Sequence, residues 1–330
     1  MLSEGFSQVY MATGARIKEA MIPPENTAHE IEKYCADVSD RFRHFGWDKD
    51  PCAGISWHAA VRSRGGRPLL FAEFGKGEEV TLILSGVHPD ELTPIPLIFR
   101  FAKYLAQNPE IYVGKDIKIV IAPLVNPDGF FLQTPTRTNS SGVDLNRNFY
   151  TADWYSRAKK FWVEWRKSQP THFPGYFPNS EIETLFQIML LEKFNPDKIV
   201  SVHAPLGFLD YDGPGDGVQR QLTEIERRAK RLPHEISAKS NNYKVVDYSF
   251  YPGSLGNFAG NERKIPTITL ELESTAPGKD AAYWKTFLPG LIQSVQYPFQ
   301  RDRLSRGPGG LFFLGEFLED PGAALKRKAM

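Results

Sequence analysis

The sequence predicts an α/β fold, with a mixed, largely parallel twisted sheet and helices on both faces. Four apolar, β-rich runs have the composition of buried strands: 81–87, 117–125, 198–202 and 265–273. Helical patterns separate these runs, and such alternation is typical of a sheet covered by helices. The 330 residues, 41% of them hydrophobic and 24% charged, are sufficient for one large core.

The first elements along the chain are a predicted helix and a predicted hairpin. Residues 27–46 form the helix, because their apolar side chains recur near the helical period. These side chains are Ile31, Tyr34, Val38 and Phe42. Residues 57–74 contain two extended runs on either side of the turn signal Arg64-Gly65-Gly66-Arg67-Pro68, which indicates a hairpin.

The middle of the chain continues the alternation of strands and helices. A helix is expected over 93–106, and it begins with two prolines in its first turn, where a missing donor costs little. The strand at 117–125 ends in the turn Asn126-Pro127-Asp128-Gly129. A polar loop then runs to Phe149.

The second half contains four predicted helices. Residues 152–167 are amphipathic, and their aromatic face indicates packing rather than a binding platform. That face consists of Trp154, Ala158, Phe161, Trp162 and Trp165. Ser180-Glu181-Ile182-Glu183 has capping-box spacing before an apolar helix that ends near Lys193. A charged surface helix is expected at 219–232 and a closing helix at 281–296.

Charge and composition exclude several classes of partner. The net charge of +1 gives no global field for nucleic acid, and no apolar run reaches the length of a membrane span. The start Met1-Leu2-Ser3-Glu4-Gly5 lacks the features of a secretory signal, which favours a cytoplasmic over a periplasmic location unless a leader has been removed. Cys35 and Cys52 leave both a single bridge and two free thiols open. The basic run at 326–328 is expected to be a solvated tail.

A split set of metal-ligand residue types points to function. His88 and Glu91 lie three positions apart, so one turn can bring both to the same ion, and His203 lies far downstream. Both histidines follow predicted strands, and sites in open α/β sheets form at the carboxyl ends of strands. Two histidines and a glutamate form the ligand set of a catalytic zinc with an open fourth position. We therefore predict one zinc ion per chain.

Four further strings accompany this set in a fixed order. They are Arg137-Thr138-Asn139-Ser140-Ser141-Gly142-Val143-Asp144-Leu145-Asn146-Arg147-Asn148-Phe149, Ser201-Val202-His203-Ala204-Pro205, Tyr251-Pro252-Gly253-Ser254-Leu255-Gly256 and Thr269-Leu270-Glu271-Leu272-Glu273. With the His-x-x-Glu motif, they resemble the zinc metallocarboxypeptidases of the carboxypeptidase A type over about residues 70 to 275. The resemblance implies a zinc carboxypeptidase-like catalytic domain at 51–300, with an N-terminal helical extension at 1–50 and a C-terminal extension at 301–330.

The resemblance also implies the catalytic base. In this family a carboxylate from the last strand activates the water and passes its proton to the leaving amine, and Glu271 matches it. Glu271 and Glu273 alternate with leucines, so the two acids share one face of the strand. Glu273 is the alternative if the register differs by two residues.

Four further residues match family positions that contact the substrate. Arg137 matches the donor that stabilises the developing oxyanion. Arg147 can hold the terminal carboxylate of the substrate in a bidentate manner, with Asn146 adding an amide donor. Tyr251 matches the mobile tyrosine that closes over the substrate, although an ordinary packed aromatic residue fits the sequence equally well.

Two strings resemble one branch of the family, the murein peptide amidases. They are 203–210 and 251–257. The branch cuts between γ-D-glutamate and meso-diaminopimelate in bacterial cell-wall peptides, which implies a small peptide substrate with a free ammonium at its far end. Asp210 or Asp212 is the candidate partner for that ammonium. The alternative is that both aspartates only stabilise their loop.

Other readings of the same residues remain. One is a carboxypeptidase that removes C-terminal L-amino acids from peptides, and another is a zinc deacylase of the aspartoacylase type. A catalytically inactive binding module is the alternative from a different class. The first 50 residues, the helix at 152–167 and the tail beyond 300 are additions to the small murein amidases, which could narrow the pocket, bind a larger muropeptide or mediate assembly.

Overall fold

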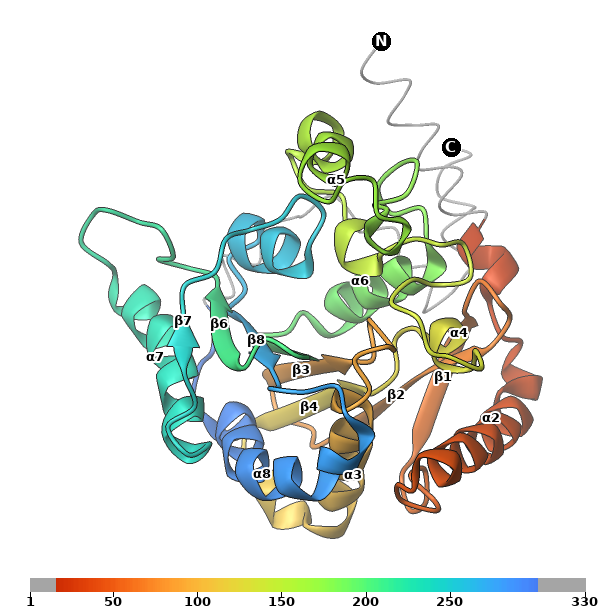
Figure 1. The fold of residues 1–330 in the computed structure, drawn as a ribbon. Helices are drawn as coiled ribbons and strands as arrows, with labels where there is room; N and C mark the ends of the chain where they lie inside the picture. The colour runs from red at the N-terminus through yellow and green to blue at the C-terminus, as the bar shows by residue number, and fades with distance from the viewer. Residues whose placement is uncertain (1–15, 302–330) are drawn as a thin grey trace, which may run out of the picture.

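The computed structural model describes residues 16–301, and its centre is an eight-stranded mixed sheet with the order β1-β2-β4-β3-β5-β8-β6-β7 (Figure 1). The strands are β1 (Trp57–Arg62), β2 (Pro68–Phe74), β3 (Glu79–Ser85), β4 (Ile117–Ala122), β5 (Lys198–His203), β6 (Phe208–Asp212), β7 (Val245–Val246) and β8 (Thr267–Glu271). The β3–β4, β3–β5, β5–β8 and β6–β7 pairs are parallel, and the others are antiparallel. The predicted fold class is confirmed.

Helices cover both faces of the sheet. The α-helices are α2 (Pro24–Phe45), α3 (Pro94–Gln107), α4 (Pro127–Phe130), α5 (Lys159–Glu164), α6 (Ile182–Phe194), α7 (Glu224–Lys239) and α8 (Asp280–Gln296). Helices α2, α3, α7 and α8 bury their apolar residues in a core on one face. Helix α6 and a π-helical segment, Gly256–Glu262, pack on the opposite face. Figure 1 shows this second layer above the sheet, with α5 farther out.

The N-terminal helix α2 packs on the hairpin formed by β1 and β2. Its buried side chains include Tyr34, Val38 and Phe42, which lie in the same core as α3 and α8. A disulfide between Cys35 and Cys52 joins α2 to the segment that leads into β1, so the structure selects the bridge over two free thiols.

The predicted aromatic helix is shorter and less regular than expected. A π-helical turn, Trp154–Ala158, leads into α5, and the helix ends before Lys167 and Ser168, which have positive φ values. Trp154 is buried, but Trp165 is 74% exposed. The predicted packed face holds for Trp154, Ala158, Phe161 and Trp162, which are buried or part-buried, and is wrong for Trp165.

Two other details of the prediction are wrong. The residue before α6 is Glu181 rather than Ser180, and no side chain caps this helix. The carboxylate of Glu183 instead accepts hydrogen bonds from the Arg64 amide and the Asn139 side chain. Helix α7 begins after Thr223, whose side chain forms a capping box with Glu226, so it starts and ends later than the predicted 219–232.

The strands β6 and β7 extend the sheet beyond the predicted set. Strand β6 was not predicted, because the short run Phe-Leu-Asp-Tyr-Asp lies between Gly207 and Gly213 and indicates a loop, yet all five of its residues are buried in the sheet. The predicted C-terminal tail beyond Arg301 and the N-terminal start lie outside the described residues. Within residues 16–301, no helix has the length and apolarity that crossing a membrane requires.

Candidate active site

The carboxyl ends of three neighbouring strands bring the predicted residues together. Strand β3 leads into His88, β5 ends at His203 and β8 ends at Glu271. His203 and Glu271 are direct partners in the parallel β5–β8 register, so their side chains lie on the same face of the sheet. Glu91 joins them through a turn in which its amide donates to the carbonyl of His88.

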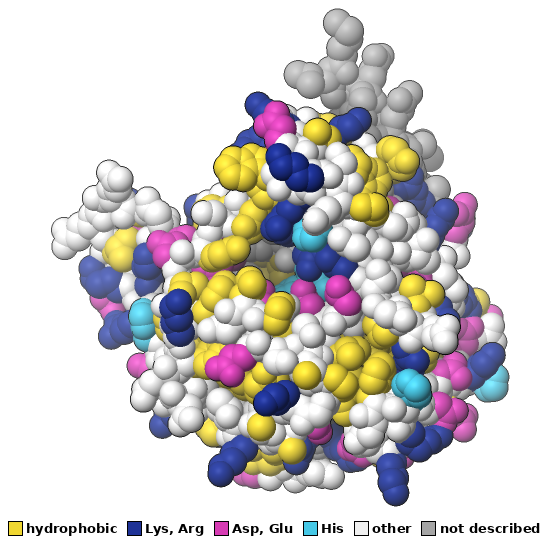
Figure 2. Space-filling view, in the orientation of Figure 1, with side chains coloured by type: hydrophobic (Ala, Val, Ile, Leu, Met, Phe, Trp, Pro, Cys, Tyr) yellow, Lys and Arg dark blue, Asp and Glu magenta, His cyan; other side chains and the backbone are white. Residues whose placement is uncertain are grey.

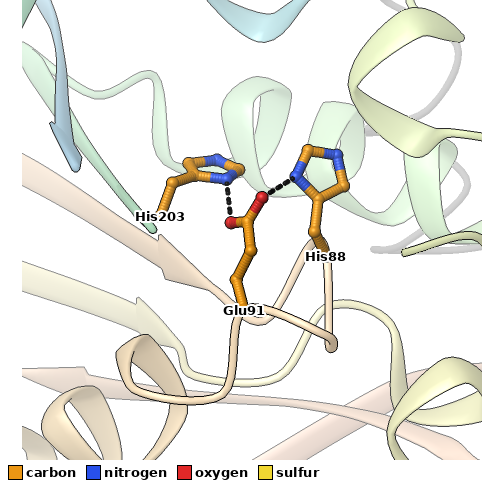
Figure 3. Close-up of side chains that lie close together, drawn as sticks. All are labelled: His88, Glu91 and His203. Carbon is orange, nitrogen blue, oxygen red and sulfur yellow. Dashed lines mark hydrogen bonds and ion pairs between the residues drawn. The ribbon is translucent and has the colours of Figure 1, made fainter. Parts of the chain in front are cut away.

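The three predicted metal ligands converge on one point. The Nδ1 atoms of His88 and His203 each lie 2.9 Å from a different oxygen of the Glu91 carboxylate (Figure 3). One ligand atom from each residue lies within 4.8 Å of the others, and all three side chains are buried. Two imidazole nitrogens and one carboxylate oxygen are a donor set that zinc prefers, so these residues fit the metal.

The charge state of Glu91 agrees with a ligand role. Burial raises the pKa of its carboxyl, but His88 and His203 outweigh this effect and hold the pKa well below its usual range. Glu91 is therefore ionised at neutral pH, as a metal ligand must be.

Two further residues orient the histidines, and the sequence analysis did not assign them a role. The Nε2 atom of His88 lies 2.9 Å from Oδ1 of the fully buried Asp144, and Nε2 of His203 lies 3.0 Å from Oγ of Ser201. Each contact leaves Nδ1 as the free ligand atom, which is how a carboxylate–histidine–zinc arrangement fixes the tautomer. Both residues lie within the sequence strings that resemble the zinc carboxypeptidases, and this location is the one indication of their role that the sequence offers.

We expect Asp144→Asn to weaken zinc binding by about 10- to 100-fold, because an amide cannot accept the His88 proton and fix its tautomer as strongly. Competition with a chelator of known zinc affinity measures the change. Asp153→Asn is a suitable control, because Asp153 lies outside the ligand set and its carboxylate accepts hydrogen bonds from the Thr151 and Asn257 side chains. Unchanged affinity in Asp144→Asn would contradict the orienting role.

Glu271 lies beside the ligand set, as its pairing with His203 requires. Burial raises the pKa of its carboxyl, the two histidines oppose this effect, and Glu91 adds to it. Its Oε2 atom accepts a long hydrogen bond, 3.4 Å, from the Leu206 amide. Glu273, the alternative, is exposed and follows the end of β8. The structure therefore brings Glu271, rather than Glu273, to the candidate metal centre.

Arg137 reaches the centre from a loop that is anchored to α6. Its Nε donates to Asp144 at 2.9 Å and its Nη1 to Glu91 at 3.1 Å. The loop is fixed by Asn139, whose side-chain amide donates to Glu181 at 2.8 Å and to Glu183 at 2.9 Å. These two acids thus support the loop that carries Arg137 instead of capping their own helix.

Three of the predicted substrate-binding residues lie next to one another: Asn146, Arg147 and Tyr251. The guanidinium carbon of Arg147 lies 4.5 Å from the centre of the Tyr251 ring, a cation–π contact. The side-chain oxygen of Asn146 accepts from the Leu255 amide, which leaves the Asn146 NH₂ as a donor. Gly253 makes this approach possible: its φ is +74°, and a Cβ there would lie 2.1 Å from the Arg147 carbonyl oxygen.

The two candidate aspartates lie on the same face of the sheet as Glu271. Phe208 pairs with Glu271 in the β6–β8 register, so Asp210 and Asp212 follow on that face at alternate positions. Asp210 accepts a 2.9 Å hydrogen bond from the Tyr248 amide. Asp212 lies beneath Gly256 and Gly260, where a Cβ at Gly256 would lie 1.9 Å from its Oδ2.

Neither aspartate has a cationic partner among the described residues. Burial raises the pKa of Asp210 to about 7, and Asp216 and Asp247 add to the shift. The pKa of Asp212 is also raised well above its usual value, again by burial first and then by neighbouring carboxylates.

One face of the molecule is hollowed. Figure 2 shows a depression near the middle of the molecule, with Lys or Arg and His side chains on its upper wall and acidic side chains on its lower wall. Apolar side chains surround this depression on several sides. The arrangement suits a small substrate that carries both negative and positive groups.

The fold and this site define a class of protein. The zinc carboxypeptidase family matches residues 55–289, so the chain belongs to that family and is a zinc metallocarboxypeptidase, a hydrolase. Membership in the family implies zinc as the cofactor.

Two proteins of known name are similar to this chain in sequence. The chain is 31% identical to murein peptide amidase A of Vibrio campbellii over 214 residues, which cover 63% of this chain and 75% of that protein. It is also 31% identical to murein peptide amidase A of Escherichia coli K12 over 215 residues, which cover 64% of this chain and 78% of that protein.

Solved structures share the fold. Bovine thrombin-activatable fibrinolysis inhibitor aligns with a TM-score of 0.62 at 16% identity, over 82% of this chain and 96% of that chain. A murein-tripeptide amidase from Escherichia coli O157 aligns with a TM-score of 0.50 at 23% identity, over 76% of this chain and 94% of that chain.

Proposed function

We propose that this chain hydrolyses the γ-D-glutamyl–meso-diaminopimelate bond of murein peptides, with one zinc ion per chain bound by His88, Glu91 and His203. The proposed catalytic domain spans 51–300. The substrate assignment depends on one observation, the buried carboxylate of Asp210, which has no cationic partner within residues 16–301 and lies on the same sheet face as Glu271. The names of the two relatives, which match over at least three quarters of their length, support the same substrate class.

The chemistry at the cut bond uses groups around the metal. When bound, zinc polarises the scissile carbonyl and lowers the pKa of the water beside it. Glu271 takes a proton from the attacking water and passes it to the leaving amine, and its raised pKa suits both steps. Arg137 donates to the developing oxyanion, because its Nη2 makes no hydrogen bond to a described residue while Nε and Nη1 fix its position.

The terminal carboxylate of the substrate is held by a second group of residues. Arg147 offers a fork of donors, because its only side-chain hydrogen bond among the described residues is to the Asn146 carbonyl. The NH₂ of Asn146 adds a donor, and Tyr251 covers the carboxylate from above. Tyr251 currently hydrogen-bonds the hydroxyl of Tyr248 and contacts Phe161, so closing over the substrate requires these contacts to change.

The cation of diaminopimelate is the proposed partner of Asp210. A buried carboxylate without a counter-charge is costly, and an incoming ammonium removes that cost by favouring the ionised form. Because the pKa of Asp210 is raised to about 7, its ionised fraction grows as the pH rises through that value. The KM for an ammonium-bearing substrate should therefore fall over the same pH range.

We expect Asp210→Asn to raise the KM for L-Ala-γ-D-Glu-meso-diaminopimelate by about 10- to 100-fold, the range for a lost charge-assisted hydrogen bond. The asparagine keeps an acceptor for the Tyr248 amide, so the fold around β6 should persist. The matched substrate contains 2-aminopimelate, which lacks only the far amine. Equal effects of the substitution on both substrates, or an unchanged pH profile of KM, would contradict the assignment.

The proposed function itself is tested with the zinc-loaded protein. We would incubate it with the murein tripeptide and, separately, with all-L peptides, and follow the products by mass spectrometry. Release of diaminopimelate that stops with a chelator supports the proposal. Cleavage of only the all-L peptides would favour an ordinary carboxypeptidase, and cleavage of neither by the zinc-bound protein would favour an acylated amino acid as the substrate.

A further inference from the structure

A second arginine lies beside the one that holds the terminal carboxylate. The guanidinium carbon of Arg166 lies 5.8 Å from the centre of the Tyr251 ring, the same ring that Arg147 contacts at 4.5 Å. Arg147 is only 7% exposed. The Nε atoms of both arginines are buried without a hydrogen-bond partner, and within residues 16–301 neither side chain pairs with a carboxylate.

The position of Arg166 is fixed by the segment that the sequence analysis noted as an addition. Phe161, in α5, packs its ring against Tyr251 at 5.2 Å and lies 5.8 Å from the Arg166 guanidinium carbon. Trp154, at the start of the same segment, donates its indole N–H to the Arg147 carbonyl at 2.8 Å. The segment therefore holds Arg166 and Arg147 together around one tyrosine.

No ion pair with a carboxylate of residues 16–301 offsets the charge of either arginine. Burial lowers the pKa of Arg147 to about 10, and Arg137 and Arg166 add to the shift against the opposing effect of Asp144. The neighbouring His172 is neutral at pH 7, because burial and the charges of Arg137, Arg166 and Arg147 lower its pKa to about 4, so it adds no further positive charge. Arg137 is neutralised by Glu91 and Asp144, but Arg147 and Arg166 are left for anions from outside.

One terminal carboxylate does not satisfy both arginines. A fork-to-fork pair with one guanidinium uses both oxygens of a carboxylate, and its single negative charge offsets only one of the two positive charges. An ordinary peptide would therefore engage Arg147 and leave Arg166 without an anion. A substrate with a second carboxylate within reach would engage both.

We infer that Arg166 binds a second carboxylate of the substrate and makes the site selective for peptides with more than one carboxylate at the cut end. The inference rests on the proposed function, because it names a further feature of that substrate. The murein tripeptide offers two sources: the far carboxylate of diaminopimelate and the α-carboxylate of γ-linked D-glutamate.

The kinetic test compares Arg166→Gln with the wild type on three tripeptides. The first is L-Ala-γ-D-Glu-meso-diaminopimelate, the second has L-Lys in place of diaminopimelate and so lacks the far carboxylate, and the third has D-isoglutamine in place of D-Glu. We expect kcat/KM for the first to fall by about 10- to 100-fold. The analogue on which the loss disappears identifies the carboxylate. An equal loss on all three, or no loss on the first, overturns the inference.

Arg157→Gln is the matched control, because Arg157 is an exposed arginine of the same segment that pairs with Asp153. It should leave kcat/KM for all three peptides within about twofold, since exposed pairs contribute little. An effect of this control equal to that of Arg166→Gln would assign the change to the segment as a whole and overturn the inference.

A binding measurement separates this inference from the proposed function. Inorganic sulfate is titrated calorimetrically into the zinc-loaded wild type, Arg166→Gln and Arg157→Gln. We expect saturable binding that weakens at least about tenfold in Arg166→Gln only. Equal binding by all three proteins, or no saturable binding to the wild type, overturns the anion site. Specific sulfate binding without hydrolysis of any murein peptide would instead overturn the proposed function and leave the anion site standing.

Discussion

Replacement of Glu271 by glutamine is expected to lower kcat by about 10²- to 10⁴-fold, the contribution of a positioned general acid–base. The amide has nearly the same shape, but it can neither take the proton of the attacking water nor return one to the leaving amine. Because Glu271 is not among the three ligands, the zinc content should stay at one ion per chain. Steady-state kinetics and metal analysis of the same preparation test both parts.

Glu273→Gln is the control for this substitution. Glu273 lies two residues farther along the chain and is exposed, so its replacement should change kcat by no more than about twofold. Loss of activity in Glu273→Gln with retention in Glu271→Gln would show that the assigned register is wrong. A zinc-free Glu271→Gln protein would point to a ligand role for this carboxylate.

Arg137→Gln should lower kcat by about 10²- to 10³-fold with a smaller change in KM, as expected for a donor that acts on the developing oxyanion. Arg137 also donates to Asp144 and Glu91, so zinc affinity has to be measured alongside the rate. Arg137→Lys retains the charge and should recover part of the activity. A raised KM with an unchanged kcat would assign Arg137 to substrate binding instead.

Much of the candidate site could be predicted because it lies at strand ends. Apolar, β-rich runs identified the strands before His88 and His203, and the carboxyl ends of parallel strands lie at one edge of the sheet. The structure brings these residues and Glu91 together. Asp144 lies within the 137–149 string that resembles the family. Its contact with His88 depends on the path of this loop, which no local sequence pattern predicts.

The parts that the sequence did not predict involve polar groups whose partners are distant in the chain. Strand β6 alternates Leu209 and Tyr211 with Asp210 and Asp212, but it has only five residues and its polar face is buried, whereas acids in a short run next to glycines indicate a surface loop. The Ser180 spacing indicated a cap, but Asn139 and Arg64 bind Glu183 from elsewhere in the chain. The sequence did not indicate a binding role for Arg166, because an arginine in a charged segment is ordinarily exposed to solvent.

The bridge between Cys35 and Cys52 makes the N-terminal helix sensitive to redox conditions. The two cysteines are 17 positions apart, and closing a loop of this size stabilises a fold by about 3 kcal/mol in the chain-entropy account. A glutathione-reduced compartment keeps such a pair as thiols, whereas an oxidising one closes it. In the reduced state α2 would be held by the packing of Tyr34, Val38 and Phe42 and by polar contacts such as the Glu30–Arg62 ion pair. The oxidation state of this cysteine pair in protein taken from cells therefore records the compartment in which the chain folded.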